Sequence, residues 1–537
     1  MAPNPPQPAP ADAAPDTFSA ARAFVHVQAI AREPHPIGSP ADAIVRAYIT
    51  NQLWSLGLRT ESQGFVAGAR AGGAHGVNLM ARLPGLANAD PGHKTPALAL
   101  VCHHDSVPTG PGAADDGSGV ATLLETARAL KSGPPLRNDV LFLFTDGEEA
   151  GLDGAQAFVG AHPWMREVGF VLNFEARGVN GPVFMFETGK GNGRAIAEFA
   201  KAAPRPVANS LMYEIYRNMP NDTDLTVFKH AGVAGLNFGF IGDPKRYHSP
   251  TDDPAHLDRG SLQHDGSYAL SLARQFGNID LNGIQTSDAV YFDLLGRTLV
   301  HYPAAWAVPM AGAGVLLFLV VAWRKVRSAQ ASLGHIVLAW VVAGVNLALV
   351  WAFFRYDLHW LNKAWKTAPA WWGAFLETPY FVASMGVTIC LNSVLYLLLR
   401  KRIAPASFAL GGLFSWVLLA LGTAIMAPGA SYMTLLPLVF GVVGVAMSRK
   451  PADGAPALGL PVLLFAALPA ALFLFPFVQG AFVALGPWVM LVPAMVLTLG
   501  LGAITLQMEA LAASWGWFVP FAALCVSAGA VAWAAYA

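Results

Sequence analysis

Residues 97–116, ALALVCHHDSVPTGPGAADD, join a short apolar run to a group of polar side chains. The run ALALVCH has the length and apolar content of a strand buried on both faces of a sheet. It is followed at 117–130 by GSGVATLLETARAL, whose apolar spacing is that of an amphipathic helix. A buried strand that leads into a helix predicts one unit of a parallel sheet covered by helices.

The same alternation continues on both sides of this stretch. Upstream, two amphipathic helical patterns precede two strand candidates, and downstream a long helical pattern ends near residue 278. We therefore expect an α/β domain over residues 17–300, with a mostly parallel sheet flanked by helices. The further strand candidates downstream are DVLFLFTD, GFVLNFE, VFMFET and AGLNFGFIG.

Composition changes at the two ends of this domain. Residues 1–16 are rich in Pro and Ala without an apolar core, so we expect a disordered lead-in that is not a signal peptide. Only 13% of the whole chain is charged and 54% is hydrophobic, and the long apolar runs begin at Ala304. Runs of roughly 20 apolar residues predict about eight transmembrane helices over 304–537 and a lipid bilayer around them.

Basic clusters indicate an orientation for these spans. They follow the first, third and fifth candidate spans, at 324–327, 400–402 and 449–450. The positive-inside rule puts these loops in the cytoplasm and the N-terminal domain on the other side, in periplasm, exterior or lumen. Export of such a domain needs an upstream signal or anchor. Either that segment precedes this sequence or the orientation is reversed; the agreement of three loops favours the first.

Charge and cysteine content exclude some classes of protein. The formal net charge is zero and the N-terminal domain has no basic stripe, which argues against a nucleic-acid partner. The three cysteines lie far apart and predict neither a disulfide framework nor a CxxC metal site. Cys102 lies inside an apolar strand, where a buried structural role is favoured over that of a nucleophile. Nothing in the sequence indicates an oligomeric state.

Polar side chains follow several of the predicted strands at the point where each strand ends. Ligands of open α/β sheets collect at these carboxyl ends, so we expect the side chains to converge at one edge. Two histidines and several carboxylates are in such positions: His103, Asp105, Asp115, Asp116, Asp146, Glu148, Glu149, Glu175 and His248.

This set of residue types predicts a zinc hydrolase site. Imidazole and carboxylate suit catalytic zinc, which keeps one position open for water. A site with two ions about 3.5–4 Å apart accounts for two histidines and at least three carboxylates more economically than a site with one ion. One carboxylate then bridges the ions, and another acidic residue takes the proton from the water. The adjacent pair Glu148 and Glu149 supplies both kinds of carboxylate.

Five strings of this sequence, in order, resemble metallopeptidase family twenty-eight, the co-catalytic zinc aminopeptidases. They are HHDS, PGAADDGSG, FTDGEEAGLDGA, NFEARG and YHSPTDD, and the resemblance covers roughly residues 17–285. Within the family the chain is most similar to the membrane-bound branch of endoplasmic reticulum (Fxna-like) metallopeptidases and vacuolar membrane proteases. The apolar C-terminal part suits that branch.

The resemblance implies the metal ligands and two zinc ions per chain. His103 and Glu175 then belong to the first ion, Glu149 and His248 to the second, and Asp115 bridges the two. The family has Asp at the position of Glu175, a difference that the Fxna-like branch shares. The resemblance also implies a cis peptide bond after Asp115.

Further roles concern the reaction and the substrate. By the resemblance, Glu148 is the general base, Asp105 orients His103, and the protein is an exopeptidase, an aminopeptidase acting on peptide or protein substrates. Asp222 and Tyr247 are candidates for the substrate pocket, with a structural role equally open. Arg177 either pairs with an acidic neighbour or holds a substrate carboxylate; the sequence does not separate these alternatives.

Three other interpretations remain open at this stage. A glutaminyl cyclase of the same fold uses a single zinc ion, and a carboxypeptidase binds the other end of the peptide. A transporter or receptor would carry its function in the membrane domain and keep the N-terminal domain as a relic.

The acidic residues Asp115 and Asp116, taken singly, are also candidates for helix caps, and His104 is assigned to structure.

Overall fold

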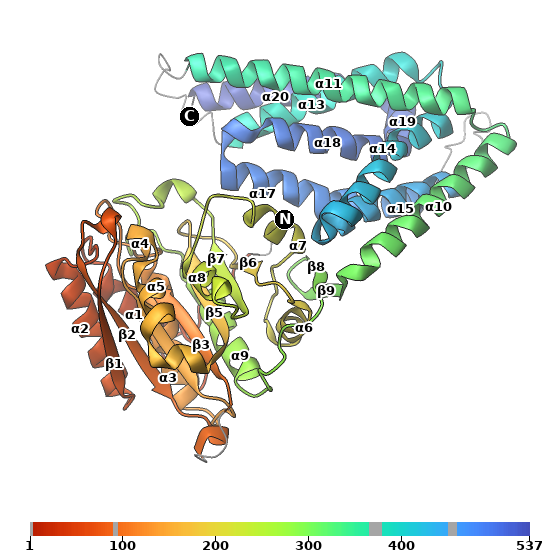
Figure 1. Cartoon of the computed structure of the whole chain (residues 1–537). Helices are drawn as coiled ribbons and strands as arrows, with labels where there is room; N and C mark the ends of the chain where they lie inside the picture. Colours follow the sequence, from red (N-terminus) through yellow and green to blue (C-terminus); the bar gives the residue numbers. More distant parts are fainter. Residues whose placement is uncertain (1–3, 90–94, 365–377, 449–458, 537) are drawn as a thin grey trace. The chain divides into compact units, whose positions relative to one another are not determined.

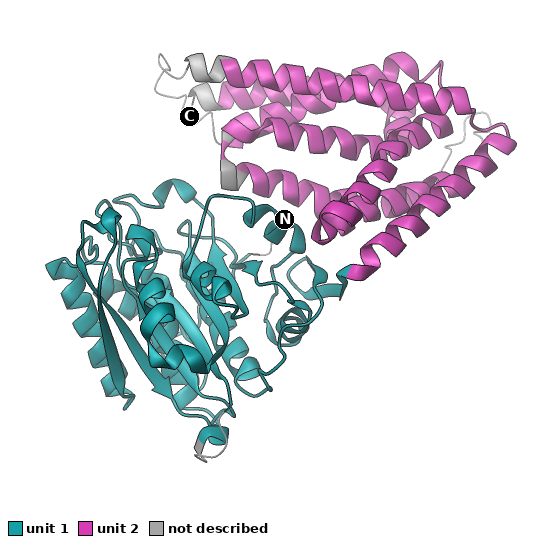
Figure 2. Ribbon diagram, viewed as in Figure 1, with its two compact units in different colours: residues 1–304 teal, residues 305–537 magenta. Residues whose placement is uncertain are grey.

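The computed structural model describes residues 4–89, 95–364, 378–448 and 459–536. The chain divides into two compact units, Met1–Ala304 and Ala305–Ala537, shown in teal and magenta in Figure 2. The basic pair at 449–450, used above for the orientation, lies outside the described residues. Each unit has hydrophobic core clusters of its own.

Unit 1 contains a seven-stranded mixed sheet with the order β1-β2-β4-β3-β5-β7-β6 (Figure 1). The four central strands β4, β3, β5 and β7 run parallel, whereas β1, β2 and β6 pair antiparallel at the edges. The expected α/β class is confirmed, and every predicted strand is present. Their bounds are β1 Thr60–Val66, β2 His75–Leu83, β3 Ala97–His103, β4 Val140–Thr145, β5 Val168–Ala176, β6 Phe184–Thr188 and β7 Gly235–Phe240.

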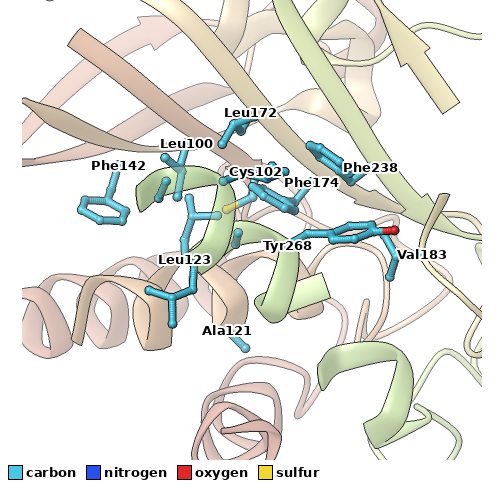
Figure 3. Packing of buried hydrophobic residues seen from close by; sticks show 14 of the residues in the cluster. Leu100, Cys102, Ala121, Leu123, Phe142, Leu172, Phe174, Val183, Phe238 and Tyr268 are labelled. Carbon is cyan, nitrogen blue, oxygen red and sulfur yellow. The ribbon is translucent and has the colours of Figure 1, made fainter. Parts of the chain in front are cut away.

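Both faces of the central strands are buried, which explains why their sequences are apolar throughout. Successive side chains of a strand point to opposite faces. In β3, Leu100 and Cys102 contribute to the core that also contains α3, whereas Ala99 and Val101 contribute to the core on the opposite face. Figure 3 shows Cys102 among the side chains of the first core, close to Phe174. Cys102 is therefore a structural cysteine of the core, fully buried.

Helices cover the two faces of the sheet in separate groups. The α1, α2, α3 and α9 helices share the larger core, while α5 and α8 pack on the other face. The helices α4 and α7 and the hairpin β8–β9 were absent from the sequence analysis, because each of these elements is short. The helices of the unit are α1 Ala20–Ile30, α2 Pro40–Ser55, α3 Gly117–Lys131, α4 Glu148–Gly151, α5 Asp153–Ala161, α6 Gly193–Ala202, α7 Ser210–Tyr216, α8 Asp224–His230 and α9 Arg259–Phe276; the hairpin strands are β8 Ala289–Leu294 and β9 Thr298–Pro303.

The N-terminal segment is ordered from residue 4, which corrects the expectation of a disordered lead-in. A chain rich in Pro and Ala makes few hydrogen bonds of its own, so its carbonyl groups remain available as acceptors. Arg22 donates to the carbonyl oxygens of Ala11 and Ala13 at 2.8 and 2.9 Å. The amide oxygen of Gln263 accepts from Ala9 N and Ala20 N at 2.8 and 2.9 Å. Tertiary contacts, rather than local propensity, fix this segment.

Unit 2 is all-helical and apolar. Among its described residues, six helices are long and apolar enough to cross a membrane, or seven if α18 (Leu491–Ala503) and α19 (Thr505–Trp515), bent by 80°, form one span. α20 (Phe518–Tyr536) contains a shorter apolar stretch, so the expected total of about eight stays a prediction. The six candidate spans are Ala304–Arg327, Leu333–His359, Thr378–Leu399, Pro405–Met426, Pro428–Met447 and Leu460–Phe482.

Replacing Gln263 tests how the N-terminal segment is held. Gln263→Ala removes the acceptor for two backbone amides, and each lost hydrogen bond costs about 0.5–1.5 kcal/mol. We expect amide hydrogen exchange of residues 9–20 to accelerate by about tenfold in the full-length protein. Gln275→Ala, on the same helix but bonded to Glu198, is the matched control. Unchanged exchange in the Gln263 variant would show that this contact does not anchor the segment.

Candidate metal site at the carboxyl edge of the sheet

The structure brings the predicted ligand residues to one edge of the sheet. His103 is the last residue of β3, and the two adjacent glutamates open α4 directly after β4. Glu175 is the second-to-last residue of β5, and His248 lies in the loop after β7. Because β3, β4, β5 and β7 are parallel, their carboxyl ends meet, and residues more than 140 positions apart converge there.

Asp115 lies at the centre of this group. Its Oδ1 is 3.2 Å from His103 Nε2, and its Oδ2 is 3.2 Å from His248 Nε2. The carboxylate therefore directs one oxygen to each histidine. Glu175 Oε2 lies 3.7 Å from His103 Nε2, and Glu149 Oε2 lies 3.0 Å from His248 Nε2. Two half-sites result, and Asp115 is shared between them.

These separations fit ligands that share a metal ion. Zinc binds nitrogen and oxygen at about 2.0–2.2 Å, so two ligand atoms on a tetrahedral ion are about 3.4 Å apart. The four measured separations range from 3.0 to 3.7 Å. Asp115 Oδ2 and His248 Nε2 are buried and, although 3.2 Å apart, form no hydrogen bond; Glu149 Oε1 is buried and forms none either. Buried polar atoms are normally satisfied, so these three atoms indicate a cation at this position.

Asp116 also lies within reach of His103 and Glu175, but its carboxylate has other partners. Its Oδ1 accepts from Gly119 N at 2.9 Å and its Oδ2 from His103 N at 3.3 Å. Asp116 is thus the N-cap of α3, and the two acidic residues separate into a cap and a shared carboxylate. The peptide bond between them is cis, as the resemblance implied.

Burial makes this group of carboxylates unfavourable when all are charged. Burial raises the pKa of Glu149 to about 7, and the carboxylate of Asp115 adds to the shift. Burial likewise raises the pKa of Glu175 to about 8, with the Asp115 charge acting in the same direction. Divalent cations among these groups would favour the ionised forms and lower both pKa values.

Glu148 is the member of the pair that is free of partners. Burial, together with the neighbouring carboxylates of Glu175, Asp224 and Glu149, raises its pKa well above the usual range. Its carboxylate makes no hydrogen bond or ion pair with any residue that the structure describes. The side chain is thus available for proton transfer, whereas Glu149 faces His248.

Asp105 connects His103 to the glutamate pair. His103 Nδ1 lies 3.0 Å from the backbone oxygen of Asp105 and 3.4 Å from its Oδ1. The two carboxylate oxygens of Asp105 accept from the backbone N–H groups of Glu148 and Glu149 at 3.1 and 3.3 Å. Asp105 therefore fixes the first turn of α4 as well as the imidazole, a connection that the sequence analysis did not include.

Two supporting residues were missed. Asn173 donates to Glu175 Oε1 at 3.1 Å and to Asn237 Oδ1 at 3.1 Å, which leaves Glu175 Oε2 facing His103. Asn173 lies two positions before Glu175, and the two-residue period of a strand would have placed both on one face. Asp252 accepts from Ala114 N at 2.7 Å and from Asp115 N at 3.2 Å, and no local pattern could link residues so far apart.

The three substrate candidates have different surroundings. Tyr247 stacks on the ring of His248, with 3.7 Å between ring centroids. The guanidinium carbon of Arg177 lies 5.8 Å from the Tyr247 ring centroid. Asp222 is exposed in the segment before α8 and forms no hydrogen bond or ion pair with Arg177, Tyr247 or His248. Arg177 and Tyr247 are therefore near the candidate site, and Asp222 stays a prediction.

His104 belongs to a separate buried group. Its Nδ1 lies 3.1 Å from Asp42 Oδ1, and its Nε2 lies 3.2 Å from the backbone oxygen of Val77. Arg46 pairs with both Asp42 and Asp146 and supplies the positive charge for the two carboxylates. This group ties α2 to β2 and β4, which gives His104 the structural role that the sequence analysis assigned to it.

Residues 78–273 match the sequence model of one protein family, which is described as Peptidase family M28. Unit 1 contains a peptidase family M28 domain. The match begins in β2, ends in α9 and includes all of the candidate ligands. The resemblance drawn from the five strings is confirmed, and so is the expected class, a zinc metallopeptidase domain. The family implies zinc as the metal for the M28 domain.

Two curated relatives are named as a membrane protease and as a metallopeptidase of the endoplasmic reticulum. The vacuolar membrane protease of Candida dubliniensis is 31% identical over 324 residues, which cover 56% of this chain and 34% of the relative. The endoplasmic reticulum metallopeptidase 1 of Rattus norvegicus is 28% identical over 288 residues, 50% of this chain and 32% of the relative. The chain thus matches about a third of the length of each. The relatives and the apolar helices of unit 2 together make this chain an integral membrane protein.

One solved structure is similar to part of this chain. The aminopeptidase from Aneurinibacillus sp. strain AM-1 covers 49% of this chain and 94% of its own, with 15% sequence identity and a TM-score of 0.40.

Replacing Asp105 tests its connection between the histidine and the glutamate pair. Asp105→Asn keeps the shape of the side chain but substitutes an amide donor for one oxygen that accepts from the α4 backbone. Loss of such a supporting partner typically costs 10–100-fold in metal affinity. We expect a loss in that range when zinc is titrated against a chelator of known affinity. Asp139→Asn, remote from the site and paired with Arg82, is the control; equal affinities for both variants would contradict the role.

Proposed function

We propose that this protein is a membrane-anchored exopeptidase of the aminopeptidase type with two zinc ions per chain. The observation that carries the proposal is the Asp115 carboxylate, which directs one oxygen to His103 and the other to His248. A single-ion site would use only one of these half-sites. His103, Asp115 and Glu175 would hold one ion, and Asp115, Glu149 and His248 the other.

The protein's own groups supply proton transfer and orientation. When bound, the ions supply Lewis-acid polarisation of the peptide carbonyl and lower the pKa of a water molecule. Glu148 takes a proton from the attacking water and passes it to the nitrogen of the departing amine, as a general base and then a general acid. Its raised pKa in the absence of the ions, caused first by burial, is consistent with a group that can hold the proton between these steps.

Supporting residues keep these groups in place during the reaction. Asp105 fixes the backbone of the glutamate pair, Asn173 leaves one oxygen of Glu175 free, and Asp252 holds the backbone of Asp115. Peptide bond hydrolysis at the amino end then follows if the free amine of a peptide binds beside the second half-site. This last step rests on the family resemblance.

The side of the membrane on which the M28 domain lies is part of the proposal. The basic residues Arg324, Lys325 and Arg327 lie in the last turn of the first span, and those at 400–402 directly follow the third span. The positive-inside rule then puts the M28 domain on the non-cytoplasmic side. Substrates would be peptides of the periplasm, exterior or lumen.

Glu148→Gln tests the proton-transfer role. The amide cannot accept the proton, so we expect kcat to fall by about 10²–10⁴ while zinc content is retained. The assay is hydrolysis of peptides with free and acetylated amino ends, together with metal content per chain. Glu61→Gln, an exposed residue of β1, is the control. Two zinc ions and hydrolysis of free amino ends only are expected.

Other outcomes of this experiment point elsewhere. One zinc ion with cyclisation of N-terminal glutamine would favour the glutaminyl cyclase. Hydrolysis that requires a free carboxyl end but not a free amine would favour a carboxypeptidase. A folded, metal-free and inactive protein would contradict the proposal and direct attention to unit 2.

Thiol labelling tests the orientation. Single cysteines are introduced at two exposed serines, Ser55 in unit 1 and Ser328 after the first span, in a chain whose own three cysteines are replaced by serine. In intact cells, a membrane-impermeant maleimide is expected to label the cysteine at 55 and not the one at 328. Inverted vesicles should show the opposite pattern. The reverse result in both preparations would overturn the orientation.

A further inference from the structure

Arg177 is an unpaired cation beside the candidate metal site. It lies two residues after Glu175, where its backbone N donates to Phe240 O at 2.9 Å and extends the contact between β5 and β7. The side chain is exposed, and its guanidinium forms no hydrogen bond or ion pair within the described part of the chain. Its backbone is thus fixed while its five N–H donors remain available.

The surroundings of Arg177 distinguish it from an ordinary surface arginine. Its guanidinium lies over Tyr247, whose ring stacks on the candidate ligand His248. The two basic residues just before Tyr247 have an acidic partner, since Arg246 pairs with Asp243 at 2.7 Å and Lys245 lies 3.9 Å from the same carboxylate. The carboxylates of the site do not neutralise Arg177 either, because three of them face the two histidines.

The distances set the size of a ligand that would reach both the metal site and Arg177. The separations of 3.7 and 5.8 Å place the guanidinium within roughly 10 Å of the His248 ring. An extended peptide advances about 3.3–3.6 Å per residue, so about three residues span this distance. The planar guanidinium matches a carboxylate through two parallel hydrogen bonds.

We propose that Arg177 is a specificity-determining residue that binds a carboxylate of short peptide substrates, the C-terminal carboxylate of di- and tripeptides in the first instance. This inference rests on the proposed peptidase function and adds a substrate class to it. Tyr247 holds the guanidinium over the approach to the site through a cation–π contact. An acidic side chain near the cleaved bond presents the same chemistry and is the second source of the carboxylate.

The test compares dialanine and trialanine with their C-terminal amides on the zinc-loaded, full-length protein. Because a charge-assisted bidentate pair is lost, amidation is expected to raise KM by about 10–100-fold with kcat little changed. In Arg177→Gln, free and amidated peptides should have similar KM values. Arg177→Lys keeps the charge without the fork and should discriminate to an intermediate degree. Arg217→Gln, an exposed arginine paired with Glu214, is the matched control.

Several results would overturn the inference. Equal KM values for free and amidated peptides in the unmodified protein would do so, as would discrimination that persists in Arg177→Gln with full metal content. A third peptide, alanyl-aspartate amide, separates the two sources of carboxylate. Recovery of low KM with this amide assigns the site to acidic side chains, and no recovery assigns it to the chain end.

A binding measurement separates failure of the inference from failure of the proposed function. Glu148→Gln and the double variant Glu148→Gln/Arg177→Gln are titrated with dialanine and its amide by calorimetry, which needs no turnover. Tighter binding of the free dipeptide that disappears in the double variant supports Arg177 even if no peptide is hydrolysed. Equal binding of both ligands to Glu148→Gln would overturn the inference even if hydrolysis is observed.

Discussion

The site of unit 1 depends on one electrostatic constraint, the burial of several carboxylates around two histidines. Asp115, Glu148, Glu149 and Glu175 lie within a region that is mostly removed from water. Carboxylates in such a place cannot all be charged unless cations compensate them. The raised pKa values and the three buried atoms without hydrogen bonds are two expressions of that constraint. Metal ions bound to these oxygens and nitrogens would relieve both, because they would favour the charged forms.

The scaffold meets this constraint by fixing the backbone around the site rather than the ligands alone. Asp105 accepts from two backbone N–H groups of α4, and Asp252 accepts from two backbone N–H groups of the loop before α3. Asp116 caps α3 directly after Asp115. Three carboxylates that are not proposed as ligands thus hold the segments that carry the ligands. Hydrogen bonds to charged acceptors are stronger than neutral ones, which suits this purpose.

The two units answer different physical requirements. Unit 1 buries a sheet between helices and collects polar groups at one edge of it, where substrate reaches them from water. Unit 2 has long apolar helices, and its composition suits a bilayer. Membrane attachment would restrict the enzyme to peptides on one side of the bilayer.

The sequence alone determined the strands, most helices, the apolar unit and the candidate ligands. Apolar runs such as ALALVCH are local signals of burial, and the polar residues that end them are visible in the order of the chain. Only the tertiary structure decided which oxygen of Asp115 faces which histidine, and that Asp116 caps α3. It also decided that residues 9–13 are held by Arg22 and Gln263, and that Arg177 lies over Tyr247 without an ion pair among the described residues. These features depend on contacts between residues far apart in the chain, and local periodicity carries no information about such contacts.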